Sequence, residues 1–245
     1  MKERPILFSG PMVCAILEGR KTQTRRVVKP QPHRVYDIAG ATFDASDGVW
    51  AWHDSTEKIC NLRRFACPYG KHGELLWVKE AWRYAGWSDD GEPKIEYAAG
   101  GSAWPKVPEE RLDGVLDIWA ALSAADNRAI DRVSADRRWR SPIHMPRWAS
   151  RLTLKITGVR VQRAQQITLD DAISEGVREV TKDGVVKKFC VYDRGDMSSV
   201  PWQDMPRDAV SCYRTLWDSI NGKSHPWASN PWVWVVEFKR VGGGA

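Results

Sequence analysis

An α+β fold is predicted for this chain of 245 residues, because strand-like apolar runs alternate with short segments that carry helix caps. Residues 151–162 alternate between apolar and polar side chains, and residues 232–238 form a compact apolar run, so both are predicted as core strands. Residues 9–19 and 168–176 each begin at a capping side chain and end at a glycine, which predicts two short helices. With 42% hydrophobic residues, the chain suits a single domain over 1–245.

The first predicted element is the helix over residues 9–19. Ser9 suits the N-cap, and Gly19 suits the left-handed residue that ends a helix. Its apolar residues share one face, so the helix is expected to pack on a barrel or sheet by that face. Its end would then present Arg20 and Lys21 to a cleft.

The middle of the chain is expected to contain two irregular insertions. Residues 29–66 are rich in Pro, Asp and Gly without sustained periodicity, and residues 100–140 show helical character only over 116–130. Between the two insertions, residues 75–78 predict a buried strand and residues 94–98 a further one.

The next strand and helix follow from clearer patterns. The alternation of residues 151–162 shifts its phase at Gly158, which predicts a β-bulge there. In the helix over 168–176, Thr168 is the predicted cap, and Glu175 is expected at the C-terminal end.

The C-terminal part is predicted as a polar loop over 177–205, an amphipathic helix over 206–220 and the closing strand over 232–238. Fourteen tryptophans are an unusually high number, and several neighbour an arginine, which suits stacking on bases. Burial in the core is the alternative. It is preferred for the tryptophans in strand-like runs, which are Trp77, Trp232 and Trp234.

Charge favours a polyanionic partner. Lys and Arg number 37 against 31 Asp and Glu, a net charge of +6, and the cations gather in GRKTQTRRVVK, NLRR and ADRRWRSPIHMPRWASR. An ordinary solvated surface is the alternative reading of each run.

Composition also predicts a cytoplasmic protein without metal or other cofactor. The five cysteines are scattered without a CxxC pair, so they are expected to be reduced thiols rather than zinc ligands. No apolar run approaches the roughly 18–20 residues of a spanning helix, and the start MKERPILFSG lacks the apolar region of a signal peptide.

Five ordered blocks carry a family resemblance: GRKTQTRR, CPYGKHGELLWVKE, IHMPRWASRLTLKITGV, ITLDDAISEGV and NPWVWVVEF. Together they resemble the ASCH domain family, in versions common in bacterial prophages. The resemblance implies a PUA-like β-barrel of about six strands with helices at its rim and a cleft associated with RNA or modified bases. It covers residues 29–66 and 100–140 poorly, in agreement with insertions there.

Small bacterial ASCH proteins similar to this chain remove the acetyl group of N4-acetylcytidine with a Lys, Thr and Glu set. The matching pattern implies Lys21, Thr24 and Glu175 as the catalytic residues here. A desolvated Lys21 would lose its proton more readily and activate the Thr24 hydroxyl or a water. Glu175 would orient Lys21 and pass a proton to the departing amine, and no metal is required.

RNA, a nucleoside or modified nucleic acid is the expected partner, with no membrane association. Two alternatives stay open: a non-catalytic RNA or modified-DNA binding module, and a ribonuclease that uses the same Lys and Glu. For Glu80 an ion pair with a nearby arginine is the alternative role, and His144 lies in a loop between two prolines. The residues expected to bind the base or nucleic acid are Arg20, Arg25, Arg26, Glu80, His144, Arg147, Trp148 and Arg151.

Overall fold

The computed structural model is an α+β chain that divides into two compact units. It describes residues 1–31, 42–44, 49–54, 61–87, 92–108, 138–182, 184–191 and 201–241. Unit 1 comprises Met1–Arg4, Cys14–Leu76 and Leu154–Arg240, and unit 2 comprises Pro5–Val13, Trp77–Thr153 and Val241–Ala245. The helical character expected over 116–130 lies outside the described residues.

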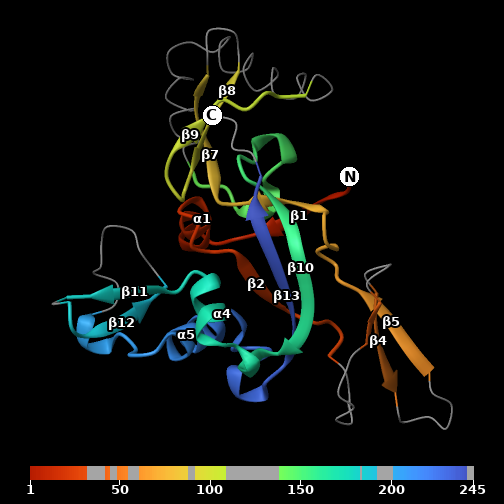
Figure 1. Cartoon of the computed structure of the whole chain (residues 1–245). Helices are drawn as coiled ribbons and strands as arrows, with labels where there is room; N and C mark the ends of the chain where they lie inside the picture. Colours follow the sequence, from red (N-terminus) through yellow and green to blue (C-terminus); the bar gives the residue numbers. More distant parts are fainter. Residues whose placement is uncertain are drawn as a thin grey trace. The chain divides into compact units, whose positions relative to one another are not determined.

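The main sheet has the strand order β1-β6-β10-β13-β2 (Figure 1). These strands are β1 (Glu3–Leu7), β6 (Leu75–Lys79), β10 (Thr153–Arg163), β13 (Trp232–Arg240) and β2 (Gln23–Val27). In the described part of the chain this order is open, with β1 and β2 at its ends. The α+β class is therefore confirmed, while the closed barrel stays a prediction.

The predicted helices form close to their expected positions. They are α1 (Gly10–Leu17), α4 (Leu169–Ser174) and α5 (Ala209–Asn221). The Thr168 hydroxyl accepts a hydrogen bond from the Asp171 amide, and the Asp208 carboxylate caps α5 in the same way. None of the helices in the described residues is both long and apolar enough to cross a bilayer.

The closing strand β13 pairs antiparallel with β10 on one side and with β2 on the other. The antiparallel register of β10 and β13 shifts between Ile156 and Gly158, which confirms the predicted bulge. Trp234 is buried as expected, whereas Trp77 and Trp232 are only half-buried. Trp77 occupies one of the less buried positions in the alternating burial pattern of β6, where Lys79 and Arg147 lie over its ring.

Two segments expected to lack regular structure contain strands. Within 29–66 lie β3 (Thr42–Asp44), β4 (Val49–Asp54) and β5 (Asn61–Ala66), and within 177–205 lie β11 (Arg178–Thr181) and β12 (Lys187–Cys190). Each group pairs only within its own small antiparallel sheet. Strands of three to six residues are too short to show the sustained alternation that predicts a core strand.

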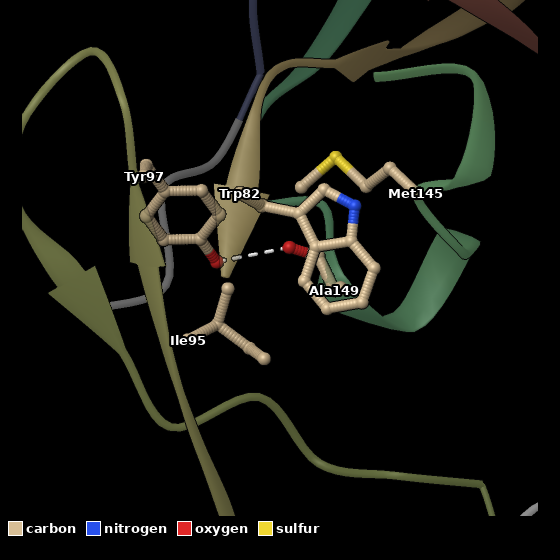
Figure 2. Packing of buried hydrophobic residues seen from close by; sticks show 5 residues of the cluster. All are labelled: Trp82, Ile95, Tyr97, Met145 and Ala149. Atoms are coloured by element: carbon tan, nitrogen blue, oxygen red, sulfur yellow. Dashed lines mark hydrogen bonds between the residues drawn. The ribbon is translucent and has the colours of Figure 1, made fainter. Parts of the chain in front are cut away.

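A third small sheet lies in unit 2 and consists of β7 (Trp82–Trp87), β8 (Pro93–Tyr97) and β9 (Ser102–Ala103). One face of it packs on the turns η1 (Pro142–His144) and η2 (Arg147–Ala149) and the residues beside them. Figure 2 shows this core, in which the Tyr97 hydroxyl donates to the Ala149 carbonyl at 2.9 Å. The five residues drawn there are Trp82, Ile95, Tyr97, Met145 and Ala149.

Candidate functional site

Lys21 lies in unit 1, in the short connection between α1 and β2. Gly19 has a φ of +76°, which turns the chain after α1, and the amides of Arg20 and Lys21 both donate to the Ala15 carbonyl at 2.9 Å. The Thr22 amide donates to the Ser174 carbonyl at 2.9 Å. The connection is thereby fixed between the end of α1 and the end of α4.

The Lys21 ammonium binds Glu175 at the C-cap of α4. Lys21 Nζ donates to Glu175 Oε2 at 2.8 Å and to the Glu175 carbonyl at 2.8 Å. The exposed side-chain fractions are 0% for Lys21 and 3% for Glu175. Burial lowers the pKa of Lys21, an effect that Glu175 opposes and that the nearby charges of Arg26 and Arg25 reinforce. The contact joins an amine with a perturbed pKa to a carboxylate.

Gly176 allows the end of α4 to approach Lys21 closely. Its φ of +103° lies in the left-handed region, where a side chain is strained. A Cβ at this position would lie 3.2 Å from Ala15 Cβ and 3.5 Å from Lys21 Cβ. Glycine is therefore favoured both by the backbone conformation and by the packing of the Lys21 stem.

Arg25 occupies the second oxygen of Glu175 and continues the network to Asp171. Its Nη1 donates to Glu175 Oε1 at 3.2 Å, and its Nη2 donates to Asp171 Oδ2 at 2.7 Å. Asp171 Oδ1 accepts from Arg160 Nη2 at 2.8 Å and from Gln23 Nε2 at 3.2 Å. Carboxylates of α4 thus face cations and an amide from β2 and β10.

Asp171 combines this network with the start of its own helix. Its side chain accepts from the Thr168 amide while its amide donates to the Thr168 hydroxyl, which completes a capping box. Partial burial alone would raise the pKa of Asp171, but the charges of Arg25 and Arg160 and the hydrogen bonds from Thr168 and Gln23 outweigh it and lower that pKa.

Tyr213 of α5 lies against the same network. The guanidinium carbon of Arg25 is 5.9 Å from the centre of the Tyr213 ring. Burial raises the pKa of Tyr213 well above its usual value, and the charge of Glu175 adds to the effect. The phenol therefore keeps its proton at neutral pH and offers the network an aromatic face.

Thr24 is buried on β2, where it pairs with Val236 of β13. Successive side chains of a strand leave from opposite faces, so Thr24 leaves β2 on the face opposite Gln23 and Arg25. The structure brings Lys21 and Glu175 into contact. A catalytic role for Thr24 stays a prediction.

The predicted binding residues divide between the two units. In unit 1, Arg20 donates to Glu18 at 2.7 Å and to the Gly176 carbonyl at 3.0 Å, beside the Lys21 pair. Arg25 belongs to the buried network, and Arg26 is half-buried opposite Trp234 in the register of β2 and β13.

In unit 2, Glu80 forms a bidentate ion pair with Arg151, with both N to O distances at 2.9 Å. Burial raises the pKa of Glu80, and the hydrogen bonds and charge of Arg151 partly oppose this. The ion pair weighed as an alternative for Glu80 is therefore present. His144 and Arg147 are exposed, and Trp148 packs partly buried against the unit 2 core.

Sequence reasoning did not single out Asp171, Gln23, Arg160 or Tyr213. A usable signal existed for Asp171, because Thr168 and Asp171 have the spacing of a capping box. Gln23 and Arg160 are brought together by the pairing of β2 and β10 with β13, and Tyr213 reaches the network from α5, so none of the three has a local sequence signal. Within the described residues, no group of three or more His, Cys, Asp or Glu side chains is placed to hold a metal ion.

Comparisons with family models, with curated proteins and with solved structures gave no match to this chain. The ASCH resemblance therefore stays a prediction from the five sequence blocks.

Proposed function

We propose that this chain is an ASCH-type protein with a PUA-like barrel that hydrolyses the N4-acyl amide of a modified cytidine, with Lys21 and Glu175 as the groups that transfer protons. The observation that carries the proposal is the 2.8 Å contact between Lys21 Nζ and Glu175 Oε2, made by two buried side chains. The lowered pKa of Lys21 supports it, because a larger fraction of the amine is then neutral and able to accept a proton.

The proposed reaction transfers one proton from the attacking water to the departing N4 nitrogen and leaves Lys21 and Glu175 as they began. Neutral Lys21 takes a proton from water as the water oxygen bonds to the acyl carbon. Lys21 passes that proton through Glu175 to the N4 nitrogen as the amide bond breaks, giving a carboxylic acid and the free cytidine amine. Arg25 and Lys21 Nζ hold the two oxygens of Glu175, so the carboxylate is oriented before substrate enters.

Burial sets a condition on this mechanism. The Lys21 side chain has no exposed surface, so substrate reaches Nζ only when the end of α4 moves away from the connection before β2. Besides the contacts to Glu175, that end is held by the hydrogen bonds from the Thr22 amide to the Ser174 carbonyl and from Arg20 to the Gly176 carbonyl. Amide hydrogen exchange in α4 is therefore expected to change when N4-acetylcytidine is added.

The decisive experiment mixes the purified chain with N4-acetylcytidine and follows deacetylation by absorbance. Lys21→Met and Glu175→Gln are each expected to lower kcat by about 10²–10⁴-fold, the usual contribution of a positioned acid or base. Glu237→Gln is the matched control, because Glu237 binds Arg160 at a more exposed position. Deacetylation that persists in both site variants would refute the assigned roles.

Thr24→Val tests the third residue of the set separately. It removes the hydroxyl and keeps the shape of the side chain. Because Thr24 leaves β2 on the face opposite Arg25, a water is assigned as the nucleophile, and kcat is expected to fall by less than about tenfold. A loss as large as that of Lys21→Met would instead identify the Thr24 hydroxyl as the nucleophile.

A further inference from the structure

The small sheet of unit 2 has one buried face and one open face. Side chains of Trp82, Ile95 and Tyr97 enter the core drawn in Figure 2, and Tyr84 and Ala103 pack against it. Strand alternation directs the intervening side chains to the other face. This outer face, formed by Arg83, Lys94, Glu96 and Ser102, is not used by the proposed hydrolytic site.

Two tryptophans border the outer face on opposite edges. Arg140 pairs with Trp82 in an isolated antiparallel bridge, which places Trp139 beside Arg83 at the β7 edge. At the other edge, Ala103 pairs with Ile95, so Trp104 follows β9 beside Lys94. The register thus aligns four side chains across the sheet, in the order Trp139, Arg83, Glu96 and Ser102. Lys94 and Trp104 form a neighbouring pair on the same face, at the next outward position of β8.

Both tryptophans combine exposure with a cation on the ring. Trp104 is 47% exposed and Trp139 is 46% exposed, and they are the only exposed tryptophans among the side chains that the structure describes. Arg83 lies 4.5 Å from the centre of the Trp139 ring, and Lys94 lies 5.6 Å from that of Trp104. Nearly half of each tryptophan therefore stays exposed to a planar ligand although a cation lies over its ring.

Among the described residues, those along the outer face carry more positive than negative charge. Exposed Lys106 and Arg138 lie near the two tryptophans in sequence and add to Lys94 and Arg83. The described acids on the β8 side are Glu96, whose ion pair with Arg83 is 2.8 Å long, and Glu92. In this described part of the surface, four cations against two carboxylates favour an anionic partner over an apolar protein surface.

We propose that the outer face of the β7–β9 sheet binds single-stranded nucleic acid, with bases stacked on Trp104 and Trp139 and phosphates bound by Lys94 and Arg83. Aromatic platforms interleaved with cations suit an unpaired strand, whose bases expose their flat faces. Three strand spacings of roughly 4.8 Å separate the two edges, a span that an oligonucleotide bridges and a single base does not.

Binding is tested on the full-length chain with fluorescein-labelled oligouridine RNA and oligothymidine DNA, by fluorescence anisotropy at low and moderate salt. The Trp104→Ala, Trp139→Ala double variant is expected to lose at least about tenfold in affinity, and Trp→Phe at both positions to retain most of it. Lys94→Glu is expected to weaken binding and to reduce its dependence on salt.

Lys182→Glu is the control for net charge, because it changes an exposed lysine of unit 1. It is expected to leave affinity within about twofold of the unmodified chain, since it changes one exposed charge that does not belong to the outer face. The proposal is overturned if neither oligonucleotide binds at low salt, or if the alanine double variant binds as tightly as the unmodified chain. Deacetylation of free N4-acetylcytidine is measured in parallel on the double variant, so failure of this surface is distinguished from failure of the proposed hydrolysis.

Discussion

Glu175 is the residue on which the unit 1 network depends, because it is the carboxylate that Lys21 and Arg25 share. Lys21 and Arg25 have no exposed side-chain surface, and their ammonium and guanidinium groups are directed at Glu175. Charges removed from water in this way are tolerated only while they stay paired and hydrogen-bonded. The same arrangement that suits proton transfer therefore also constrains how α4 meets β2.

Replacing Glu175 by Gln is expected to lower the free energy of unfolding by about 3–5 kcal/mol, because it leaves Lys21 without a carboxylate partner and removes one from Arg25. Urea denaturation followed by tryptophan fluorescence measures the change. Glu237→Gln, at the partly exposed pair with Arg160, is expected to cost less than about 1 kcal/mol. Equal effects of the two substitutions would show that burial of the network contributes nothing to stability.

The lowered pKa of Lys21 predicts a pH dependence of stability. Between the folded-state pKa and the unperturbed value of 10.5, the unfolded chain holds a proton on Lys21 that the folded chain has released. Stability therefore rises with pH in this window. Urea titrations of the unmodified chain and of Lys21→Met measure this effect. The difference between their free energies of unfolding, unmodified minus variant, is expected to increase as the pH rises from neutral towards 10.5. A difference that decreases over the same range would contradict the lowered pKa.

At the scale of elements, α4 shows what can and what cannot be predicted from sequence. Thr168 and Gly176 mark its two ends through local chemistry, and Glu175 is expected at the end of the helix for the same reason. The partners of Glu175 are harder to predict. Residues 23–27 contain four polar side chains in five, so β2 has no apolar alternation, and its strand character depends on pairing with β13.

The turn that ends α4 gives an element-scale prediction. Gly176→Ala is expected to destabilise the chain by about 1–2 kcal/mol from the left-handed backbone alone, and further because the new Cβ crowds Ala15 and Lys21. Gly184→Ala is the matched control, since Gly184 has a φ of +72° and no atom lies within 4 Å of the place that its new Cβ would take. Thermal unfolding of both variants separates the two contributions, and equal shifts in Tm would show that the packing against Lys21 is loose.

At the scale of the whole molecule, the sequence predicts one domain and the structure contains two compact units. Both units draw on segments far apart in sequence, and the chain crosses between them within β1, α1, β6 and β10. No composition shift marks such crossings, because domain boundaries are recognised in sequence by linkers that few contacts span. The predicted binding residues accordingly form one set in the sequence, although Arg20 and Arg151 belong to different units.

The two units carry carboxyls with opposite pKa shifts, which predicts that acid affects them differently. In unit 1 the pKa of Asp171 is lowered below 3.8, so its stabilising contribution is present above that value and is lost as the pH falls through the folded-state pKa. In unit 2 the pKa of Glu80 is raised above 4.5, so its contribution is largest at low pH and is lost as the pH rises through the folded-state pKa.

Amide hydrogen exchange read by mass spectrometry is therefore expected to show α4 and β2 losing protection at acidic pH before β7 and β8 do. Asp171→Asn is expected to remove much of this difference, because it deletes the carboxylate that Arg25 and Arg160 bind at neutral pH and weakens unit 1 there as well. Simultaneous loss of protection in all four elements would mean that the two units unfold as one cooperative structure.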